Sequence, residues 1–373
     1  FSKLGIYAQD DWNPTENFKL TYGVRFDGLF FNNSDLMTNK AILDLDYYDS
    51  NNDVRHIDTG KWPSAGISVS PRVGFKWDVL NDKSLTLRGG TGLFVGRLPL
   101  VFFTNMPTNS GMVQYQAQIN AKNAEKKGFT MDEFKGGLVT DANGKATTQA
   151  LLDKLYTLGY PKTITPEDGT VPSSISAVDS KFKMPQVWKT SLAVDYQLPV
   201  SFPFTVTVEG IFNKTINGVM MSDWSMLPAE GFARWNGADN RPVFPSNFRN
   251  ATKAFVLENT SKGYGYSANV TVNMRPVEGL SFMAAYTRVG SKEITGMPGS
   301  NAESAFTYVP TIAGPNNIQL HNSQYVTPDR FVASATHHDK SGNHFSLIYE
   351  TWRGGYNYSY MLANDMNGDG YSY

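Results

Sequence analysis

Hydrophobic and polar residues alternate along several long stretches of the chain. The alternation is clearest in residues 18–27, 67–78 and 264–275, where almost every second side chain is apolar and its neighbours are polar or glycine. A period of two describes a β-strand with one apolar and one polar face. These stretches exceed the ~5 to 6 residues of an average globular strand and match the ~9 to 11 residues that cross a membrane at a tilt.

The same pattern predicts about ten strands along the chain. They cover residues 3–13, 17–32, 66–80, 83–97, 185–199, 204–222, 254–276, 279–293, 328–340 and 343–360. The connections between them alternate between short and long, and the long ones are residues 33–65, 98–184, 223–253 and 294–327. This order is typical of an outer-membrane barrel, which has short periplasmic turns and long extracellular loops. We therefore predict an all-β fold, a partial transmembrane antiparallel β-barrel.

Aromatic residues gather near the short connections. They are Trp12, Phe18, Trp77, Tyr196, Phe204, Phe282 and Phe345. We interpret them as an aromatic belt at the periplasmic interface. A soluble barrel core also collects aromatic side chains, so this interpretation depends on the order of the loops.

Two local features interrupt the strand pattern. Pro71 removes a ladder donor, and we expect a bulge or a missing hydrogen bond there. The glycines within 89–96 weaken their strand and suggest that something packs closely against the wall.

The long extracellular loop 98–184 is expected to contain a short helix. Thr147 precedes leucines at helical spacing, and Gly159 provides a stop signal. The apolar stripe of this helix would pack on neighbouring loops, and a face for a partner protein is the alternative.

Composition narrows the function. The net charge of -1 lacks the basic excess of nucleic-acid binders. The absence of cysteine excludes disulfide frameworks, cysteine-ligated zinc and cysteine nucleophiles. No run reaches the ~18 to 20 consecutive apolar residues of a transmembrane helix, which leaves a barrel open. The chain begins at Phe1 and shows no secretory signal, so we expect residues 1–373 to be a fragment of a barrel domain whose N-terminal part is missing.

Residues that could carry catalysis do not form a recognisable site. The glycines of 90–96 miss the spacing of a nucleotide-binding loop. His337 and His338 are neighbours on a strand, so they point to opposite faces and cannot share a metal ion. The chain has no G-x-S-x-G motif and no Ser/His/Asp spacing of a hydrolase. We therefore expect no enzymatic activity.

The end of the chain raises a calcium hypothesis. Asp365, Asn367 and Asp369, followed by Gly370, match the opening D-x-N-x-D-G of a calcium loop. The bidentate Glu expected at the twelfth position of such a loop would lie beyond the last residue. The alternative is a surface turn rich in Asn, Asp and Gly, and we favour the turn.

A group of tyrosines is a second candidate site. Tyr356, Tyr358 and Tyr360, with Trp352, carry rings that suit sugar or peptide binding along a substrate path. The same rings suit an aromatic belt, and both interpretations stay open.

Two motifs near the start resemble a known family. The segments Leu4-Gly-Ile-Tyr-Ala-Gln-Asp-Asp-Trp12 and Leu20-Thr-Tyr-Gly-Val-Arg-Phe-Asp27 are similar to the YxQDxW and GxRxD strands of TonB-dependent outer-membrane receptors. Residues 70–75 and 87–94 continue the pattern. Residues 95–99, 105–111 and 364–370 resemble the Oar-like branch of these receptors in Bacteroidetes, which carries a carboxypeptidase-regulatory-like domain.

The resemblance implies a barrel of about 22 strands in the Gram-negative outer membrane, closed by an N-terminal plug. It implies import of a nutrient, which the sequence does not name, with energy from TonB–ExbB–ExbD through a TonB box. Plug, TonB box and closing strands are not in this sequence. The other expected partners are outer-membrane lipid and, as an open question, a surface lipoprotein. The alternative function is a surface adhesion or assembly protein that uses the barrel as an anchor.

The polar face of the predicted strands would line the lumen. Its charged residues are candidates for contacts with the plug, because buried charges need partners. Solvation in a wet lumen is the simpler explanation for any one of them. The candidates are Arg25, Arg72, Lys76, Arg88, Lys189, Asp195, Glu209 and Arg275.

Overall fold

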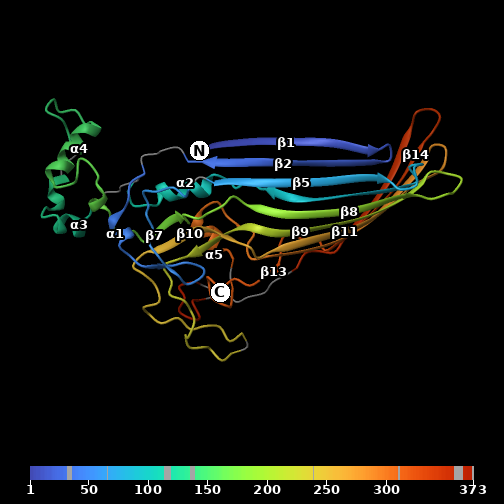
Figure 1. The fold of residues 1–373 in the computed structure, drawn as a ribbon. Coiled ribbons are helices and arrows are strands. Elements are labelled where there is room, and N and C mark those ends of the chain that lie inside the picture. The colour runs from blue at the N-terminus through green and yellow to red at the C-terminus, as the bar shows by residue number, and fades with distance from the viewer. Residues whose placement is uncertain are drawn as a thin grey trace.

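The computed structural model describes residues 1–31, 36–64, 66–112, 119–134, 139–237, 239–309, 311–356 and 364–371. Its main element is one long antiparallel sheet (Figure 1). Ten strands follow one another in this sheet, each paired with the next: β1 (Ser2–Thr15), β2 (Phe18–Phe30), β5 (Gly66–Asp78), β6 (Leu85–Val95), β8 (Gln186–Gln197), β9 (Phe204–Asp223), β11 (Tyr264–Val277), β12 (Leu280–Glu293), β14 (Asp329–His338) and β15 (His344–Trp352). The antiparallel strand order predicted from the alternation is confirmed.

The sheet is open. In the described part of the chain β1 and β15 end the path and do not pair with each other. Every residue of both strands is exposed, as expected for edges without a neighbour. The structure is therefore that of a partial barrel.

The strand register sorts the side chains onto two faces. Phe26 pairs with Val69 on the apolar face, and the adjacent Arg25 pairs with Ser70 on the polar face. The seven aromatic residues expected in a belt lie on the apolar face beside the short connections. Phe18, for example, pairs with Trp77.

The prediction of one strand over 254–276 is wrong. The segment forms two strands, because β10 (Lys253–Thr260) ends before Gly263, whose φ is +131°, and β11 begins at the next residue. Glycine adopts this backbone conformation without the steric cost that a side chain adds. β10 leaves the main path, pairing antiparallel with β9 and parallel with β7 (Ser174–Val178).

Two other expectations at the strands can be compared with the structure. Of the two alternatives expected at Pro71, the bulge does not form, because Pro71 stays in register with Val24 of β2. β5 pairs with β6 only from Arg72 onward, which places Pro71 where no bond to β6 is needed. The strand expected over 343–360 ends at Trp352, and residues 357–360 lie outside the described part.

The close packing expected at the glycines of β6 comes, at Gly89, from the wall itself. A Cβ atom on Gly89 would lie 3.1 Å from the ring of Phe75 on β5 and 2.7 Å from the carbonyl oxygen of Ser191 on β8. The glycine leaves room for these neighbours.

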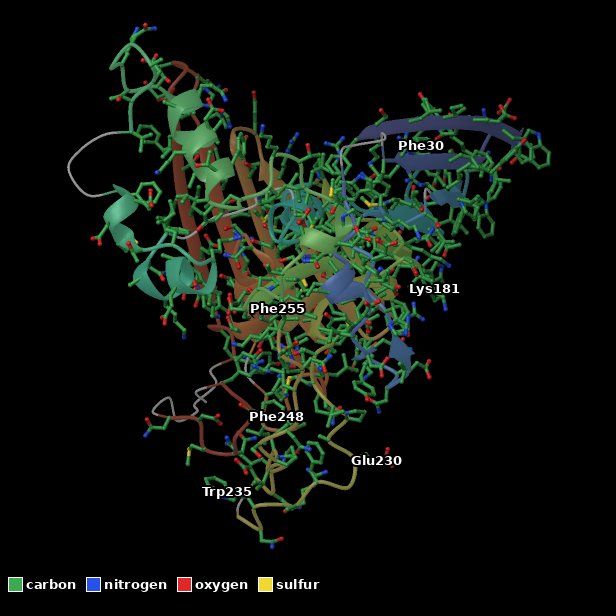
Figure 2. The ribbon with its side chains drawn as sticks, turned by 90° about the vertical axis from the view of Figure 1, so that its left-hand side faces the viewer. Phe30, Lys181, Glu230, Trp235, Phe248 and Phe255 are labelled. Carbon is green, nitrogen blue, oxygen red and sulfur yellow. The ribbon has the colours of Figure 1, made fainter. Side chains whose placement is uncertain are left out.

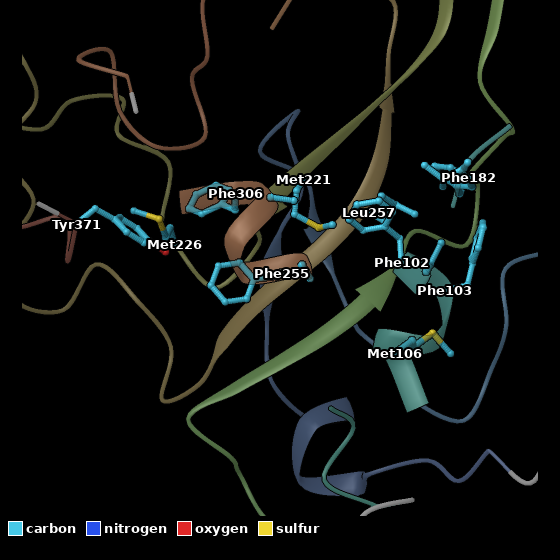
Figure 3. Packing of buried hydrophobic residues seen from close by; sticks show 14 of the residues in the cluster. Phe102, Phe103, Met106, Phe182, Met221, Met226, Phe255, Leu257, Phe306 and Tyr371 are labelled. Atoms are coloured by element: carbon cyan, nitrogen blue, oxygen red, sulfur yellow. The ribbon is translucent and has the colours of Figure 1, made fainter. Parts of the chain in front are cut away.

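Beyond the long-loop end of the sheet, the loops fold into a hydrophobic cluster that we call the loop core (Figure 3). Strands β7 and β10 and the end of β9 form a small sheet, and helices α2 (Val101–Thr108) and α5 (Ala302–Thr307) pack on it. The loop core consists of Leu29, Leu98, Phe102, Phe103, Met106, Val178, Phe182, Met221, Met226, Phe244, Phe255, Leu257, Ala302, Ala305, Phe306 and Tyr371. A second cluster covers the other face of β10 and includes Ile42, Ile175 and Val256.

The 98–184 loop holds more structure than the one helix expected. That helix is α4 (Thr148–Thr157), and the hydroxyl of Thr147 accepts a bond from the Ala150 N–H at its start. The loop also contains α2, α3 (Ala121–Lys126), η1 (Met131–Phe134), η2 (Pro166–Asp168) and β7. Figure 1 shows α3 and α4 together, away from the sheet.

Four short elements complete the described fold: α1 (Lys40–Leu43), β3 (Tyr47–Tyr48), β4 (Val54–Arg55) and β13 (His321–Asn322). None of the described helices is long and apolar enough to cross a membrane.

Candidate functional site

Charged residues on the polar face pair with one another, both between strands and along one strand. Arg88 on β6 donates from Nε to Asp195 on β8 at 2.9 Å and lies 3.4 Å from Glu209 on β9. Arg25 donates to Asp27 at 2.8 Å. These candidates for plug contacts already have partners within the wall, which weakens the prediction for them.

Four other cations on this face form no ion pair in the described part of the chain, although the charge of Lys76 acts on Asp195 and that of Arg72 on Asp27. They are Arg72, Lys189, Lys76 and Arg275. The Arg72 guanidinium lies 4.3 Å and the Lys189 ammonium 5.7 Å from the ring centre of Phe94. Arg72, Lys189 and Phe94 line a cavity of about 410 Å³ on the wall. These four residues remain the candidates for contact with a plug.

Three of the four long loops meet around a cavity of about 330 Å³. Tyr48, Met226 and Phe244 provide apolar walls, and Glu230 and Arg234 provide charges of both signs. Figure 2 shows the loop that carries Glu230 and Trp235 projecting away from the sheet. The remaining lining residues are Asp49, Ser50, Asn52, Leu227, Pro228, Ala229, Ala313, Gly314, Pro315, Asn316 and Asn317. The lining as a whole is more polar than the mostly apolar lining that is typical of sites for small organic ligands.

A buried carboxylate connects the loops around this cavity. Asp223, at the end of β9, has no exposed surface and pairs with Arg249 at 3.3 Å. It also accepts hydrogen bonds from the Ala254 N–H at 3.0 Å and the Tyr371 hydroxyl at 3.2 Å. The side-chain amide of Asn316 accepts a hydrogen bond from the Asp223 N–H and donates one to the Asp223 carbonyl oxygen. Burial and the Asp223 charge raise the pKa of Tyr371, so that hydroxyl stays a donor.

A second buried acid lies on β10. Glu258 is 4% exposed and accepts hydrogen bonds from Ser50, at 2.9 Å, and from Ser222. Burial raises the pKa of Glu258, the two serine donors oppose this, and the charge of Asp179 adds to it. Asp179 is itself paired with Arg55 at 3.2 Å.

The loop core should therefore lose stability as the pH rises. The folded state raises the pKa of Glu258, so the folded loops hold a proton that unfolded loops release. Stability is greatest below the ordinary glutamate pKa and falls as the pH passes through the raised one. Hydrogen exchange of the β10 amides, corrected for the intrinsic rate, should show this slope, and Glu258→Gln should flatten it. Glu303→Gln, which changes a half-exposed acid on α5, is the matched control. Equal slopes in all three proteins would contradict the prediction.

The structure describes the three residues of the calcium hypothesis. The carboxylate of Asp365 accepts N–H bonds from residues 368–370 at 2.8, 3.1 and 2.8 Å. Asn367 donates to the Pro242 carbonyl at 2.9 Å, and Asp369 is fully buried. In the described part of the chain, no group of three or more histidine or acidic side chains could hold a metal ion. The bonds are those of an Asx-type turn, and calcium binding stays a prediction.

Two treatments separate the turn from a calcium site. Asp365→Ala should destabilise the docked turn, because three backbone donors lose their acceptor. Chelation with EDTA should leave the thermal unfolding of the loops unchanged if the hydrogen bonds suffice. A Tm that rises with added calcium in the native protein, and not in Asp365→Ala, would establish the calcium site instead.

The tyrosine candidates are only partly described. Trp352 ends β15 opposite Arg330 on the polar face and is 60% exposed. Tyr356 follows in irregular chain, and Tyr358 and Tyr360 lie outside the described residues. Substrate binding by Trp352 stays a prediction.

Comparison with known proteins decides the family. Residues 1–360 match the family model described as an outer membrane beta barrel domain. The chain belongs to this family. The apolar face of the barrel sheet therefore faces lipid, the polar face lines the lumen, and the site of action is the Gram-negative outer membrane. Among curated proteins, none matches the chain.

Solved structures resemble the barrel domain at low identity. The outer membrane transporter YddB from Escherichia coli shares 10% identity with a TM-score of 0.44, over 92% of this chain and 32% of that one. The FrpB iron transporter from Neisseria meningitidis has 10% identity and a TM-score of 0.41, over 93% and 32%. The copper transporter OprC shares 9% identity with a TM-score of 0.41, over 93% of this chain and 34% of that one. The barrel domain spans about a third of the length of these structures.

Proposed function

We propose that the chain forms part of the wall and the extracellular loops of a TonB-dependent receptor that imports a nutrient. The family match supports the barrel, and the motifs Leu4–Trp12 and Leu20–Asp27 support this kind of receptor. The Oar-like branch is the finer part of the proposal and rests on residues 95–99, 105–111 and 364–370. TonB–ExbB–ExbD and a surface lipoprotein remain predicted partners.

The observation that carries the proposal is the loop cavity. Segments far apart in sequence, at 48–52, 226–244 and 313–317, converge on one partly open cavity at the extracellular end of the wall. A barrel used only as an anchor does not require its loops to share a cavity. The mixture of aromatic, amide and charged groups suits capture of a small polar nutrient.

Filling the cavity tests the proposal. Ala229 and Ala313 both line it, so the Ala229→Trp/Ala313→Trp variant of the complete protein should occupy much of the space. Cells that carry the native protein or the variant are grown in a defined medium, and depletion of its compounds is followed by mass spectrometry. At least one compound should lose its depletion both in the variant and in native cells treated with a protonophore.

The control is Val54→Trp, which adds the same ring to an exposed position outside the cavity. Uptake should persist in that variant. Depletion profiles that are identical in all strains, with attachment to surfaces lost when the protein is deleted, would favour the adhesion function.

A further inference from the structure

On strands β9, β11, β12, β14 and β15, the charged residues of the lipid-facing side lie at one end only. The register places Lys214, Arg288, Lys292 and Asp329 there, on the apolar face. Arg353, directly after β15, joins them because its Nε lies 3.0 Å from Asp329. We call these five residues the rim cluster.

The rim cluster lies beyond the apolar span of the wall. Counted from the short-turn end, Arg288 is the ninth residue and Lys292 the thirteenth of β12. Lys214 is the eleventh residue of β9. A transmembrane strand needs ~9 to 11 residues, so these side chains reach the outer interface of the membrane. Nearer the short turns, the lipid-facing positions of the five strands hold no Asp, Glu, Lys or Arg.

Asp329, the one acid of the rim cluster, forms ion pairs with two of its cations. Asp329 accepts two bonds from Arg288 at 2.7 Å and one from the Tyr286 hydroxyl at 2.8 Å, and it pairs with Arg353. Lys292 forms no ion pair in the described part of the chain. Four cations against one carboxylate leave a net positive charge at the rim.

The spacing suits an extended anionic group. Lys214 and Lys292 both pair with Tyr264, one on each side, which puts their backbones about 10 Å apart because neighbouring strands are ~4.8 Å apart. Arg288 lies four residues from Lys292 on the same strand, about 13 Å along it. The exposed rings of Tyr264, Tyr266 and Tyr286 separate the cations. Aromatic rings suit the boundary between acyl chains and headgroups.

We propose that the rim cluster binds the phosphate groups of a phosphorylated glycolipid in the outer leaflet of the outer membrane. Guanidinium and ammonium groups are the side chains that bind phosphate best, and guanidinium does so in a bidentate manner. A cationic patch that faces lipid at the extracellular rim meets lipid headgroups rather than substrate. The site depends on the outer-membrane location and not on the proposed transport.

The test is native mass spectrometry of the complete protein in detergent, with lipid A that carries two phosphates as the probe. The Lys292→Gln/Arg353→Gln variant removes two cations and keeps the pair between Arg288 and Asp329. We expect lipid A to bind the native protein and to bind this variant about tenfold more weakly. Lipid A treated with phosphatase should bind both proteins equally weakly, and inorganic phosphate should not displace the intact lipid.

The matched control is Arg330→Gln/Lys189→Gln, which removes two cations from the lumen face. Arg330 is adjacent to Asp329 in sequence, but its side chain lies on the opposite face of β14 and pairs with Glu350. Lipid A should bind this control as it binds the native protein. An equal loss in both double variants, or no loss in Lys292→Gln/Arg353→Gln, would overturn the proposal. Heat-modifiable gel mobility shows which variants fold. If Lys292→Gln/Arg353→Gln does not fold, the single variant Lys292→Gln takes its place, and we expect it to bind lipid A about threefold more weakly than the native protein does.

Discussion

Replacing Asp223 with alanine is expected to release the extracellular loops from the barrel wall. The substitution leaves the guanidinium of Arg249, 14% exposed, without its carboxylate and removes the acceptor for Ala254 and Tyr371. Loss of one partner from a buried ion pair costs about 3–5 kcal/mol, because the other charge stays buried. Limited proteolysis of the complete protein in intact cells should then cut within loop 223–253, while the barrel keeps its heat-modifiable mobility.

The comparison variant is Glu303→Ala on α5, in the same part of the molecule. Its carboxylate is half-exposed and lies 4.0 Å from Lys253. Exposed pairs of this kind contribute about 1 kcal/mol or less, so protease resistance should stay near the native level. If Asp223→Ala were as resistant as Glu303→Ala, the buried carboxylate would not be what fastens the loops.

The barrel strands could be predicted because each of their faces meets a different environment. Lipid on one side and a wet lumen on the other impose a period of two, and the period is visible in β2, β5 and β11. The register between strands follows from the same constraint, since a slip of one residue would exchange the two faces. The polar face could therefore be assigned, but not which of its charges pair, since the pairing of Arg88 with Asp195 depends on register and rotamer.

The loop core could not be found in this way, because neither face of its central strand meets water. In β10, Phe255 and Leu257 enter the loop core, while Ala254 and Val256 enter the second cluster. A strand buried on both faces shows a continuous apolar run instead of alternation. The strand predicted over 254–276 therefore joins the run 254–257 to β11, and the alternation gives no signal for the buried acids Asp223 and Glu258. The run and Gly263 were the available signals.

Phe255→Ala is the second substitution for which we expect a large effect. The ring is 1% exposed and packs against Phe306 of α5 with 5.6 Å between ring centres. Truncation of a buried phenylalanine costs about 3–5 kcal/mol, since the cavity that forms closes only in part. Because β10 pairs with both β7 and β9, its loosening should spread to β7 and not to the membrane-spanning part of the sheet. Hydrogen exchange should therefore accelerate in residues 174–178 and 253–260 while β11 and β12 keep their protection.

Phe345→Ala separates this local effect from a general one. Phe345 is 63% exposed and lies on the lipid-facing side of β15, far from the loop core. Its truncation should leave exchange in β7 and β10 unchanged. If Phe255→Ala instead accelerated exchange throughout β11 and β12, the loops and the wall would unfold as one cooperative unit. The stability of the loop core would then depend on the barrel. Protection lost only in β7 and β10 would show that the extracellular loops have a stability of their own, as the two clusters on either side of β10 imply.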